Sequence, residues 1–217
     1  YFFLLILVGS INNINLNSLK FEQVKDININ GLEEQDRLIL LKEIQSLDLE
    51  NIFFINKKDL KNKIDSINLV ESYSIFKRYP DSIYIKIEKT KFLARVNNNG
   101  KIFFIGSNGK LIKNNISTIQ LPFIFGKPEI IEFLNFKKII DQSKFSYDEI
   151  KNLYFFSSKR WDLELKNKII IKLSRNNPAN SLELAFEFLH NNDLKDIKII
   201  DARINNQIIL NGKRNRI

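Results

Sequence analysis

The chain has 217 residues, of which 44% are hydrophobic, and its 34 Lys and Arg outnumber its 25 Asp and Glu to give a formal net charge of +9. This length allows one large domain or two small ones with a buried core, and the charge is compatible with an acidic protein partner, nucleic acid or an anionic membrane surface. The absence of cysteine excludes a disulfide framework and thiolate chemistry, and the single histidine excludes a His pair for a metal.

The N-terminal segment is apolar: residues 1–8 read YFFLLILV, and residues 9–19 carry no charged side chain. Eight helical residues rise only about 12 Å, whereas a bilayer requires roughly twenty apolar residues. We therefore expect residues 1–20 to be the end of a truncated transmembrane helix and its juxtamembrane segment. A signal-peptide core and a buried strand are the alternatives, although no A-x-A-like cleavage site follows. No Lys/Arg cluster flanks the segment, which favours a location of the body outside the cytoplasm.

The next part of the chain alternates between strand and helix patterns. Val24–Asn30 is expected to be a short strand, and Glu33–Leu47 and Lys57–Ile67 each carry apolar residues at helical spacing. In Val70–Glu88, Ile83, Ile85 and Ile87 alternate with polar residues after a Pro80-Asp81 turn, which indicates a β-hairpin. Each helix has one apolar stripe, so both helices are expected on one face of a three-stranded sheet.

This strand–helix–helix–strand–strand order resembles a POTRA domain, a small extracytoplasmic module that docks protein partners. The residues that carry the resemblance are Ile29-Asn30-Gly31-Leu32, Asn51-Ile52-Phe53, Val70-Glu71-Ser72 and Lys77-Arg78-Tyr79-Pro80-Asp81-Ser82-Ile83.

Beyond residue 90 short strand patterns dominate. Two helices are expected, at Glu129–Gln142 and from Pro178 onward, with Asn177 as the N-cap of the second. Strands are expected at Phe92–Val96, Lys101–Ile105, Gly109–Ile112, Arg160–Leu165, Ile169–Leu173, Ile197–Ile204 and Gln207–Leu210, and Leu121–Phe125 is a short apolar run of buried character, bounded by Pro122 and Gly126.

An apolar anchor, one POTRA module and a β-rich domain together resemble the FtsQ/DivIB family of bacterial cell-division proteins. The motifs are RWDLEL at 160–165, IIDAR at 199–203, Glu88 followed by Phe92-Leu93-Ala94, and Leu121-Pro122 with Gly126. The chain departs from the family pattern at Lys91, where proline is usual, and at Asn167-Lys168, where glycine is common.

The resemblance implies an α+β fold with a POTRA domain at 21–89, an FtsQ-type β domain at 90–210 and a basic tail at 211–217. It further implies a bitopic inner-membrane protein of the division site, without enzymatic activity, cofactor or metal. The periplasmic part would bind FtsB and, through it, FtsL, and the POTRA module would contribute to recruitment by other division proteins.

The C-terminal strand, expected at Ile204–Leu210, has no later strand to pair with, so it should be a sheet edge open to strand addition by FtsB. Arg203 at its head and Arg160 are candidate charge anchors for partner carboxylates. The candidate partner-binding residues are therefore Arg160, Arg203, Ile204, Asn206, Gln207, Ile208, Ile209 and Leu210.

Plainer roles are available for the same residues. Arg203 can form a surface pair with Asp201, and Arg160 can cover Trp161 or pair with Glu164. Trp161 fits a core position better than a binding hot spot. The basic tail, 213–216, is compatible with a solvated end or with a contact to anionic lipid.

No Gly-rich phosphate loop, nucleophile elbow or metal-spaced cluster occurs, which argues against an enzyme. Two other function classes stay open. One is a POTRA-bearing chaperone or translocation component, although regular ten-residue alternating strands are lacking after the hairpin. The other is a basic nucleic-acid-binding protein, although the aromatic residues lie among aliphatic ones rather than among Lys and Arg.

Overall fold

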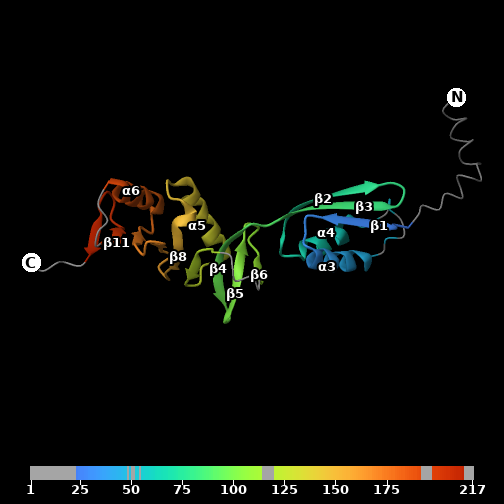
Figure 1. Cartoon of the computed structure of the whole chain (residues 1–217), viewed down its shortest axis with the longest axis horizontal. Helices are drawn as coiled ribbons and strands as arrows, with labels where there is room; N and C mark the ends of the chain where they lie inside the picture. The colour runs from blue at the N-terminus through green and yellow to red at the C-terminus, as the bar shows by residue number, and fades with distance from the viewer. Residues whose placement is uncertain are drawn as a thin grey trace, which may run out of the picture. The chain divides into compact units, whose positions relative to one another are not determined.

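The computed structural model describes residues 23–47, 49, 52–53, 55–113, 120–191 and 197–212. Its chain divides between Lys89 and Thr90 into two compact units, which we describe separately (Figure 1). The expected anchor, residues 1–20, and residues 213–217 of the expected tail lie outside the described residues. Within the described ranges, no helix is both long enough and apolar enough to cross a membrane.

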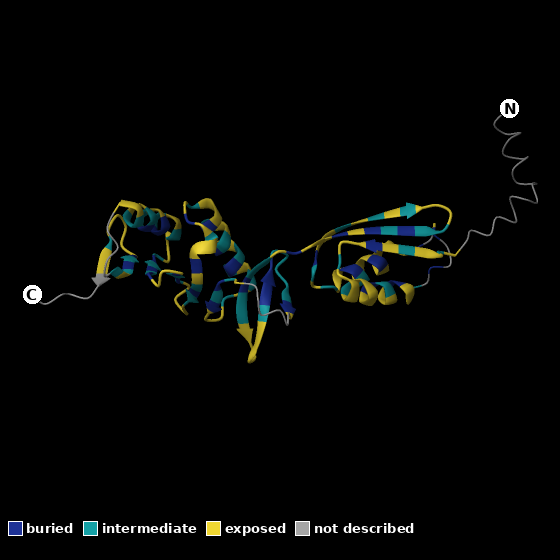
Figure 2. Cartoon of the chain, in the orientation of Figure 1, coloured by how far each residue is buried: buried dark blue, intermediate teal, exposed yellow. Residues whose placement is uncertain are grey.

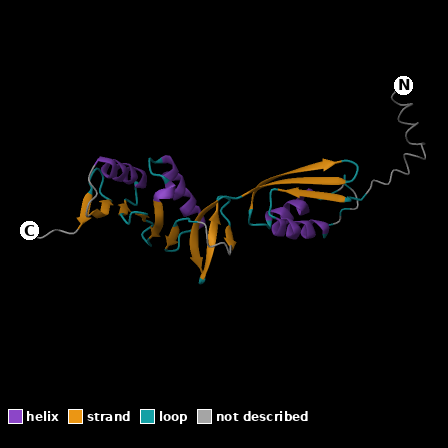
Figure 3. Cartoon of the chain, viewed as in Figure 1, coloured by secondary structure: helices purple, strands orange, loops and turns teal. Residues whose placement is uncertain are grey.

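The first unit has the predicted order of elements: β1 (Asp26–Asn30), α3 (Glu34–Gln45), α4 (Lys57–Asp65), β2 (Val70–Arg78) and β3 (Ser82–Lys89). The three strands form a sheet in the order β1-β3-β2, with β1 parallel and β2 antiparallel to β3 (Figure 3). The turn between β2 and β3 contains a cis peptide bond before Pro80.

The core of the first unit lies between the sheet and its two helices. The alternation in β3 gives the sheet one buried and one open face, because successive side chains of a strand point to opposite sides. Ile83, Ile85 and Ile87 are buried, whereas Lys86 and Glu88 are exposed. The helices bury their apolar stripes against these isoleucines through Leu40, Ile44, Leu60 and Ile64.

The second unit contains one nine-stranded mixed sheet, in the order β12-β11-β10-β9-β8-β7-β4-β5-β6. Its helices are α5 (Ile130–Gln142) and α6 (Pro178–Asn191), and a 3₁₀ turn lies at Tyr147–Glu149. The strands are β4 (Phe92–Asn98), β5 (Lys101–Gly106), β6 (Leu111–Lys113), β7 (Phe123–Phe125), β8 (Ile150–Phe155), β9 (Trp161–Leu165), β10 (Ile170–Leu173), β11 (Ile197–Ala202) and β12 (Ile209–Gly212). The predicted α+β class is thus confirmed.

Both helices of the second unit pack on the same face of this sheet. Phe133, Phe136 and Ile140 of α5 and Leu182 and Ala185 of α6 belong to one core with the sheet. Figure 2 shows buried positions on both of these helices. The strand residues that face them form a row whose members are paired across adjacent strands: Ile124, Leu153, Leu163, Ile171, Ile200 and Leu210. We call this set the core row.

One strand was not predicted. β8 has the sequence IKNLYF, and its buried residues Ile150 and Leu153 are three positions apart instead of two or four. A register shift between Ile150 and Asn152 explains the spacing, because the extra residue of a β-bulge breaks the alternation of a strand. Because of the bulge, the buried residues of β8 do not recur at every second position, so the alternation used to predict strands does not identify β8.

The hairpin between β9 and β10 keeps its tight turn without the usual glycine. Lys168 adopts φ of +72° there, and Asn167 accepts a hydrogen bond from the backbone N–H of Ile169 at 3.1 Å. Asparagine side chains stabilise such turns by bonding to the backbone two residues on. The departure from the family pattern is therefore accommodated locally.

Gly126, directly after β7, permits the close approach of β7 to β8. It has φ of +99°, and a Cβ placed there would lie 2.2 Å from the carbonyl oxygen of Phe155, whereas Gly100 has φ of +79° and open space around its Cβ position. Alanine at either site should cost about 1–2 kcal/mol for the left-handed conformation. We expect Gly126→Ala to lose a further 1–3 kcal/mol or so for the clash with backbone. Urea unfolding of both variants measures the difference, and equal losses would contradict this role of Gly126.

Candidate partner-binding site

The candidate site lies at the end of the second sheet where β12 has a neighbour on one side only. Within the described strands, β12 pairs with β11 and is the terminal member of the sheet. A terminal strand presents unpaired backbone N–H and C=O groups along its outer side. The location at an edge agrees with the expectation for the C-terminal strand, but its bounds differ.

The predicted strand Ile204–Leu210 begins too early. β11 ends at Ala202 and β12 begins at Ile209, so the intervening candidates Arg203, Ile204, Asn206, Gln207 and Ile208 lie in a loop. This loop contains a turn in which Gln207 donates its backbone N–H to the carbonyl of Ile204 at 3.2 Å, and Asn206 has φ of +57°. Asparagine tolerates this left-handed conformation, which lies outside the φ range of a regular β-strand. Ile208 is half-buried against the core.

The core row ends at β12 with Leu210, which is less buried than the other members of the row. Ile171 and Ile200 are completely buried, whereas their neighbour Leu210 is 45% exposed. Ile209, on the opposite side of the same strand, is 51% exposed. The edge therefore combines available backbone groups with apolar side chains on both faces.

Arg203, the first residue after β11, is held by Asp201 of that strand. Its guanidinium donates to both carboxylate oxygens of Asp201, with Nη2 2.6 Å from Oδ2 and Nε 2.8 Å from Oδ1. The hydrogen bonds from Arg203 lower the pKa of Asp201. The plainer expectation of an Asp201–Arg203 pair is therefore correct, and 45% of the Arg203 side chain is still exposed.

Arg160, directly before β9, is held in the same way by Asp162. Its Nε and Nη2 donate to the two carboxylate oxygens at 3.1 and 3.2 Å, and its guanidinium lies 4.3 Å from the centre of the Phe156 ring. The two contacts expected for Arg160, with Glu164 and with Trp161, are therefore not its main ones. Glu164 accepts a hydrogen bond from Tyr154 instead, and Trp161 is buried in the core, stacked on Phe136. The core role expected for Trp161 is therefore correct.

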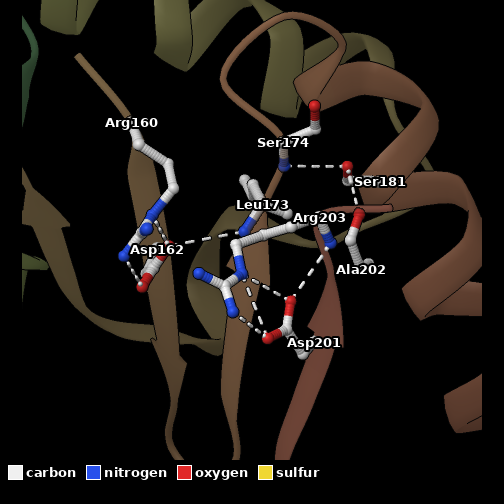
Figure 4. A network of polar contacts seen from close by, with 8 residues as sticks. All are labelled: Arg160, Asp162, Leu173, Ser174, Ser181, Asp201, Ala202 and Arg203. Atoms are coloured by element: carbon white, nitrogen blue, oxygen red, sulfur yellow. Dashed lines mark hydrogen bonds and ion pairs between the residues drawn. The ribbon is translucent and has the colours of Figure 1, made fainter. Parts of the chain in front are cut away.

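The two arginine–aspartate pairs belong to one charged row on the face of the sheet opposite the helices (Figure 4). Asp162 is paired across the sheet with Lys172, and Lys172 with Asp201. Positive and negative side chains thus alternate across β9, β10 and β11. Sequence reasoning did not identify this row, since it depends on register; the alternation of Asp162 and Glu164 in RWDLEL was the available signal.

Asp162 is the buried member of the row, with 3% exposure. Desolvation raises the pKa of Asp162, while the hydrogen bonds from Arg160 and from the backbone N–H of Leu173 oppose this effect. A buried carboxylate needs such partners to be tolerated as an ion. The arrangement fixes the direction of Arg160 relative to β9.

A buried serine fixes the end of β11 from which Arg203 projects. The Ser181 hydroxyl of α6 donates to the carbonyl of Ala202 at 2.7 Å and accepts from the backbone N–H of Ser174 at 3.0 Å (Figure 4). α6 therefore ties the end of β11 to the segment after β10. Both arginines are positioned by the fold.

Side chains of the described residues form no group of three or more potential metal ligands, and each of their buried polar atoms has a hydrogen-bond partner. What the edge offers to another molecule is backbone hydrogen bonding and two half-exposed aliphatic side chains. The oriented guanidinium groups lie further in: Arg203 follows the neighbouring strand β11, and Arg160 precedes β9, two strands beyond β11.

Glu164, on the same open face, stabilises the sheet as an ion. It accepts hydrogen bonds from Tyr154 Oη at 2.6 Å, Asn152 Nδ2 at 2.8 Å and Lys151 Nζ at 3.0 Å. These hydrogen bonds lower its pKa from 4.5 to about 2. Because the folded-state pKa lies below the unfolded one, the stabilisation is present above about pH 4.5 and is lost as the pH falls toward 2.

We expect Glu164→Gln to lower the free energy of unfolding by about 2 kcal/mol at pH 7 and by little near pH 2, where the pH equals the folded-state pKa and about half of the wild-type carboxylate is protonated. Urea unfolding at both pH values measures the change. Glu183→Gln is the control, because the Glu183 side chain is 59% exposed and such a residue contributes little. A loss that is independent of pH would show that the charge of Glu164 is not the cause.

Two protein-family models match the chain. Residues 23–89 match the model described as "POTRA domain, FtsQ-type". Residues 94–203 match the model described as "Cell division protein FtsQ/DivIB, C-terminal". The second match ends at Arg203, so β12 lies beyond it.

Curated relatives carry the corresponding names. Cell division protein FtsQ of Bradyrhizobium diazoefficiens is 20% identical over 94% of this chain and 60% of its own length. FtsQ of Rickettsia bellii is 24% identical over 77% of this chain and 61% of its own length. Cell division protein DivIB of Streptococcus gordonii is 27% identical over 59% of this chain and 33% of its own length.

In the alignments with the two FtsQ proteins, the chain spans about 60% of the length of the relative. The two family models together cover both units of the structure. The chain therefore belongs to the FtsQ/DivIB family of bacterial cell division proteins.

Proposed function

We propose that this chain is a non-catalytic scaffold of the division site, anchored in the inner membrane with both units in the periplasm, and that its second unit binds FtsB and, through it, FtsL. Membership of a cell division family supports the role in division. The identity of the partners and the location follow from the resemblance and are part of the proposal.

The proposed mode of binding is addition of an FtsB strand to the outer side of β12. The observation that carries it is the abrupt end of the core row, where buried Ile200 is followed by Leu210 with 45% exposure. An added strand would satisfy the outer backbone groups of β12 and place a side chain next to Leu210. Backbone pairing supplies affinity in this mode, and alternate side chains supply specificity.

The positive charge of the second half of the chain favours an acidic partner segment. Residues 90–217 contain 22 Lys and Arg and 12 Asp and Glu, so this half of the chain attracts an acidic segment. A carboxylate of the partner would share Arg160 or Arg203 with the aspartate that already orients it. A guanidinium has five N–H donors, so one aspartate does not saturate it.

A pair of proline variants tests strand addition. In an antiparallel ladder, hydrogen-bonded and non-hydrogen-bonded pairs alternate, so one of Ile209 and Leu210 directs its N–H toward β11 and the other directs it outward. We expect the outward variant, Ile209→Pro or Leu210→Pro, to bind the FtsB periplasmic segment at least about tenfold more weakly, which corresponds to about 1.4 kcal/mol. Isothermal titration calorimetry measures the affinity.

The inward variant serves as the control for stability, because its proline removes a hydrogen bond to β11 and lowers the melting temperature. The outward variant should keep the wild-type melting temperature while its affinity falls. Wild-type affinity in both variants would exclude strand addition at β12.

Arginine variants test the charge anchors. We expect Arg160→Ala and Arg203→Ala each to weaken FtsB binding about tenfold, because hydrogen bonds to charged groups contribute about 1.5–3 kcal/mol. The weakening should diminish at high salt. Arg175→Ala is the matched control, since Arg175 is an exposed arginine of the same unit outside the charged row. An equal effect of all three substitutions would show general charge attraction instead of anchoring.

A further inference from the structure

The chain enters the first unit beside the turn between β2 and β3. The backbone N–H groups of Lys25 and Asp26 donate to the carbonyl of Asp81 at 2.8 and 3.4 Å. From there β1 runs parallel to β3, so the start of β1 and this turn lie at the same end of the unit (Figure 1). We call the turn, residues 79–81, together with Phe53 beside it, the hairpin tip.

Two aromatic side chains are exposed at the hairpin tip. Tyr79 is 59% exposed, and Phe53, from the loop before α4, is 48% exposed. Their rings are stacked with centres 4.7 Å apart. Single exposed apolar residues are ordinary on a protein surface, whereas apolar side chains gathered at one place indicate contact with another molecule or with a membrane.

The fold holds this aromatic pair in place. The ammonium group of Lys77, on β2, donates to the carbonyl of Ile52 at 2.5 Å and to that of Phe53 at 3.4 Å. The side chain of Ile52 is completely buried in the core of the unit. Phe53 is therefore fixed between a core residue and a hydrogen bond to β2, and its ring is presented to the outside together with that of Tyr79.

Cations lie beside the two rings. Lys57 and Lys58 are the first residues of α4, and Arg78 directly precedes Tyr79. Lys57 and Tyr79 line the same groove. All three basic side chains are exposed, and among the described residues Lys57 and Lys58 form no ion pair.

Positive charge prevails at this end of the unit. Segments 25–26, 57–59 and 77–81 contain five Lys and Arg and three Asp. One of these aspartates, Asp81, forms an ion pair with Lys25 at 3.6 Å. The hairpin tip thus combines an aromatic pair with a surplus of cations, which suits a surface that is apolar in depth and anionic outside.

We propose that the hairpin tip rests in the headgroup layer of a lipid membrane, with the rings of Tyr79 and Phe53 among the headgroups and with Lys57, Lys58 and Arg78 at lipid phosphates. Tyrosine is favoured in this layer because its ring is apolar and its hydroxyl is polar. Lipid phosphates attract lysine and arginine side chains that lie near the surface.

The inference rests on the membrane anchor of the proposed function, which keeps the hairpin tip close to the bilayer. Residues 21–25 join the expected anchor, residues 1–20, to β1, and five residues span at most about 17 Å. A tether this short raises the effective concentration of the membrane surface at the tip, so weak contacts suffice. A second point of contact would restrict the rotation of the first unit about its tether.

The test uses the full chain with an N-terminal hexahistidine tag, bound to nickel-chelating lipid on vesicles of phosphatidylethanolamine and phosphatidylglycerol. The tag holds the chain at the membrane whether or not residues 1–20 span it, so a failure of the tip contact is distinguished from a failure of the proposed anchor. Because the chain has no cysteine, Ser82→Cys introduces a single site for the fluorophore NBD next to the hairpin tip. Lys89→Cys places the same label at the other end of β3, about 23 Å away.

We expect a nitroxide on the lipid headgroups to quench the label at position 82 at least about twofold more than the label at position 89. Phe53→Ser/Tyr79→Ser should remove at least about half of this excess, because the two rings hold the tip in the headgroup layer. Leu38→Ser/Ile39→Ser removes two exposed apolar side chains of α3 instead, and should leave the quenching unchanged.

Charge variants test the contact with phosphate. Lys57→Glu/Lys58→Glu should lower the quenching at position 82, whereas Lys86→Glu/Lys89→Glu, an equal change of net charge further along β3, should not. Unchanged quenching in the first of these variants would overturn the assignment of the two lysines to phosphate. Equal quenching at positions 82 and 89, or an excess at position 82 that survives the loss of both rings, would overturn the proposal.

Discussion

The register of the second sheet is the constraint on which its chemistry depends. Because side chains alternate along a strand, aligning Leu163 with Ile171 and Ile200 on the helix-covered face also aligns Asp162 with Lys172 and Asp201 on the other. A shift of one residue would bury the charged row and expose the core row. The packing of α5 and α6 on the apolar face therefore also positions the charged groups of the open face.

Arg160 and Arg203 are each already paired with an aspartate, so a partner that binds them would have to remove less side-chain entropy. A free arginine loses rotamer entropy when a partner immobilises it, whereas a guanidinium already fixed by an aspartate has lost much of that entropy on folding. Asp162 is buried and bidentate, and Asp201 is tied through β11 to α6 by Ser181. A partner carboxylate would therefore meet groups of defined direction, at the expense of some competition from the two aspartates.

Local patterns in the sequence predicted most elements, and tertiary details account for the differences. The alternation at Ile83–Ile87 predicts β3 correctly, since no bulge disturbs it, and Asn177-Pro178 predicts the start of α6, where Asn177 Oδ1 accepts from the N–H of Asn180. β8 was missed because its bulge places Ile150 and Leu153 on one face. β12 was extended too far because the left-handed Asn206 is a property of the loop. The charged row could not be predicted, since cross-strand register is not readable from one strand.

Each unit has a terminal strand with unpaired backbone groups, β2 in the first and β12 in the second, but the side chains beside the two strands differ. Exposed strand edges are a hazard, because any extended chain can pair with them, so selectivity must come from side chains beside the edge. At β12 these are aliphatic residues and, after the neighbouring β11, Arg203 held by Asp201; at β2 they are half-buried Tyr73 and Ile75 and three lysines, Lys57, Lys61 and Lys77. The cations are also arranged differently: the three lysines line a groove beside β2, whereas Arg203 and Arg160 lie on the open sheet face, after β11 and before β9.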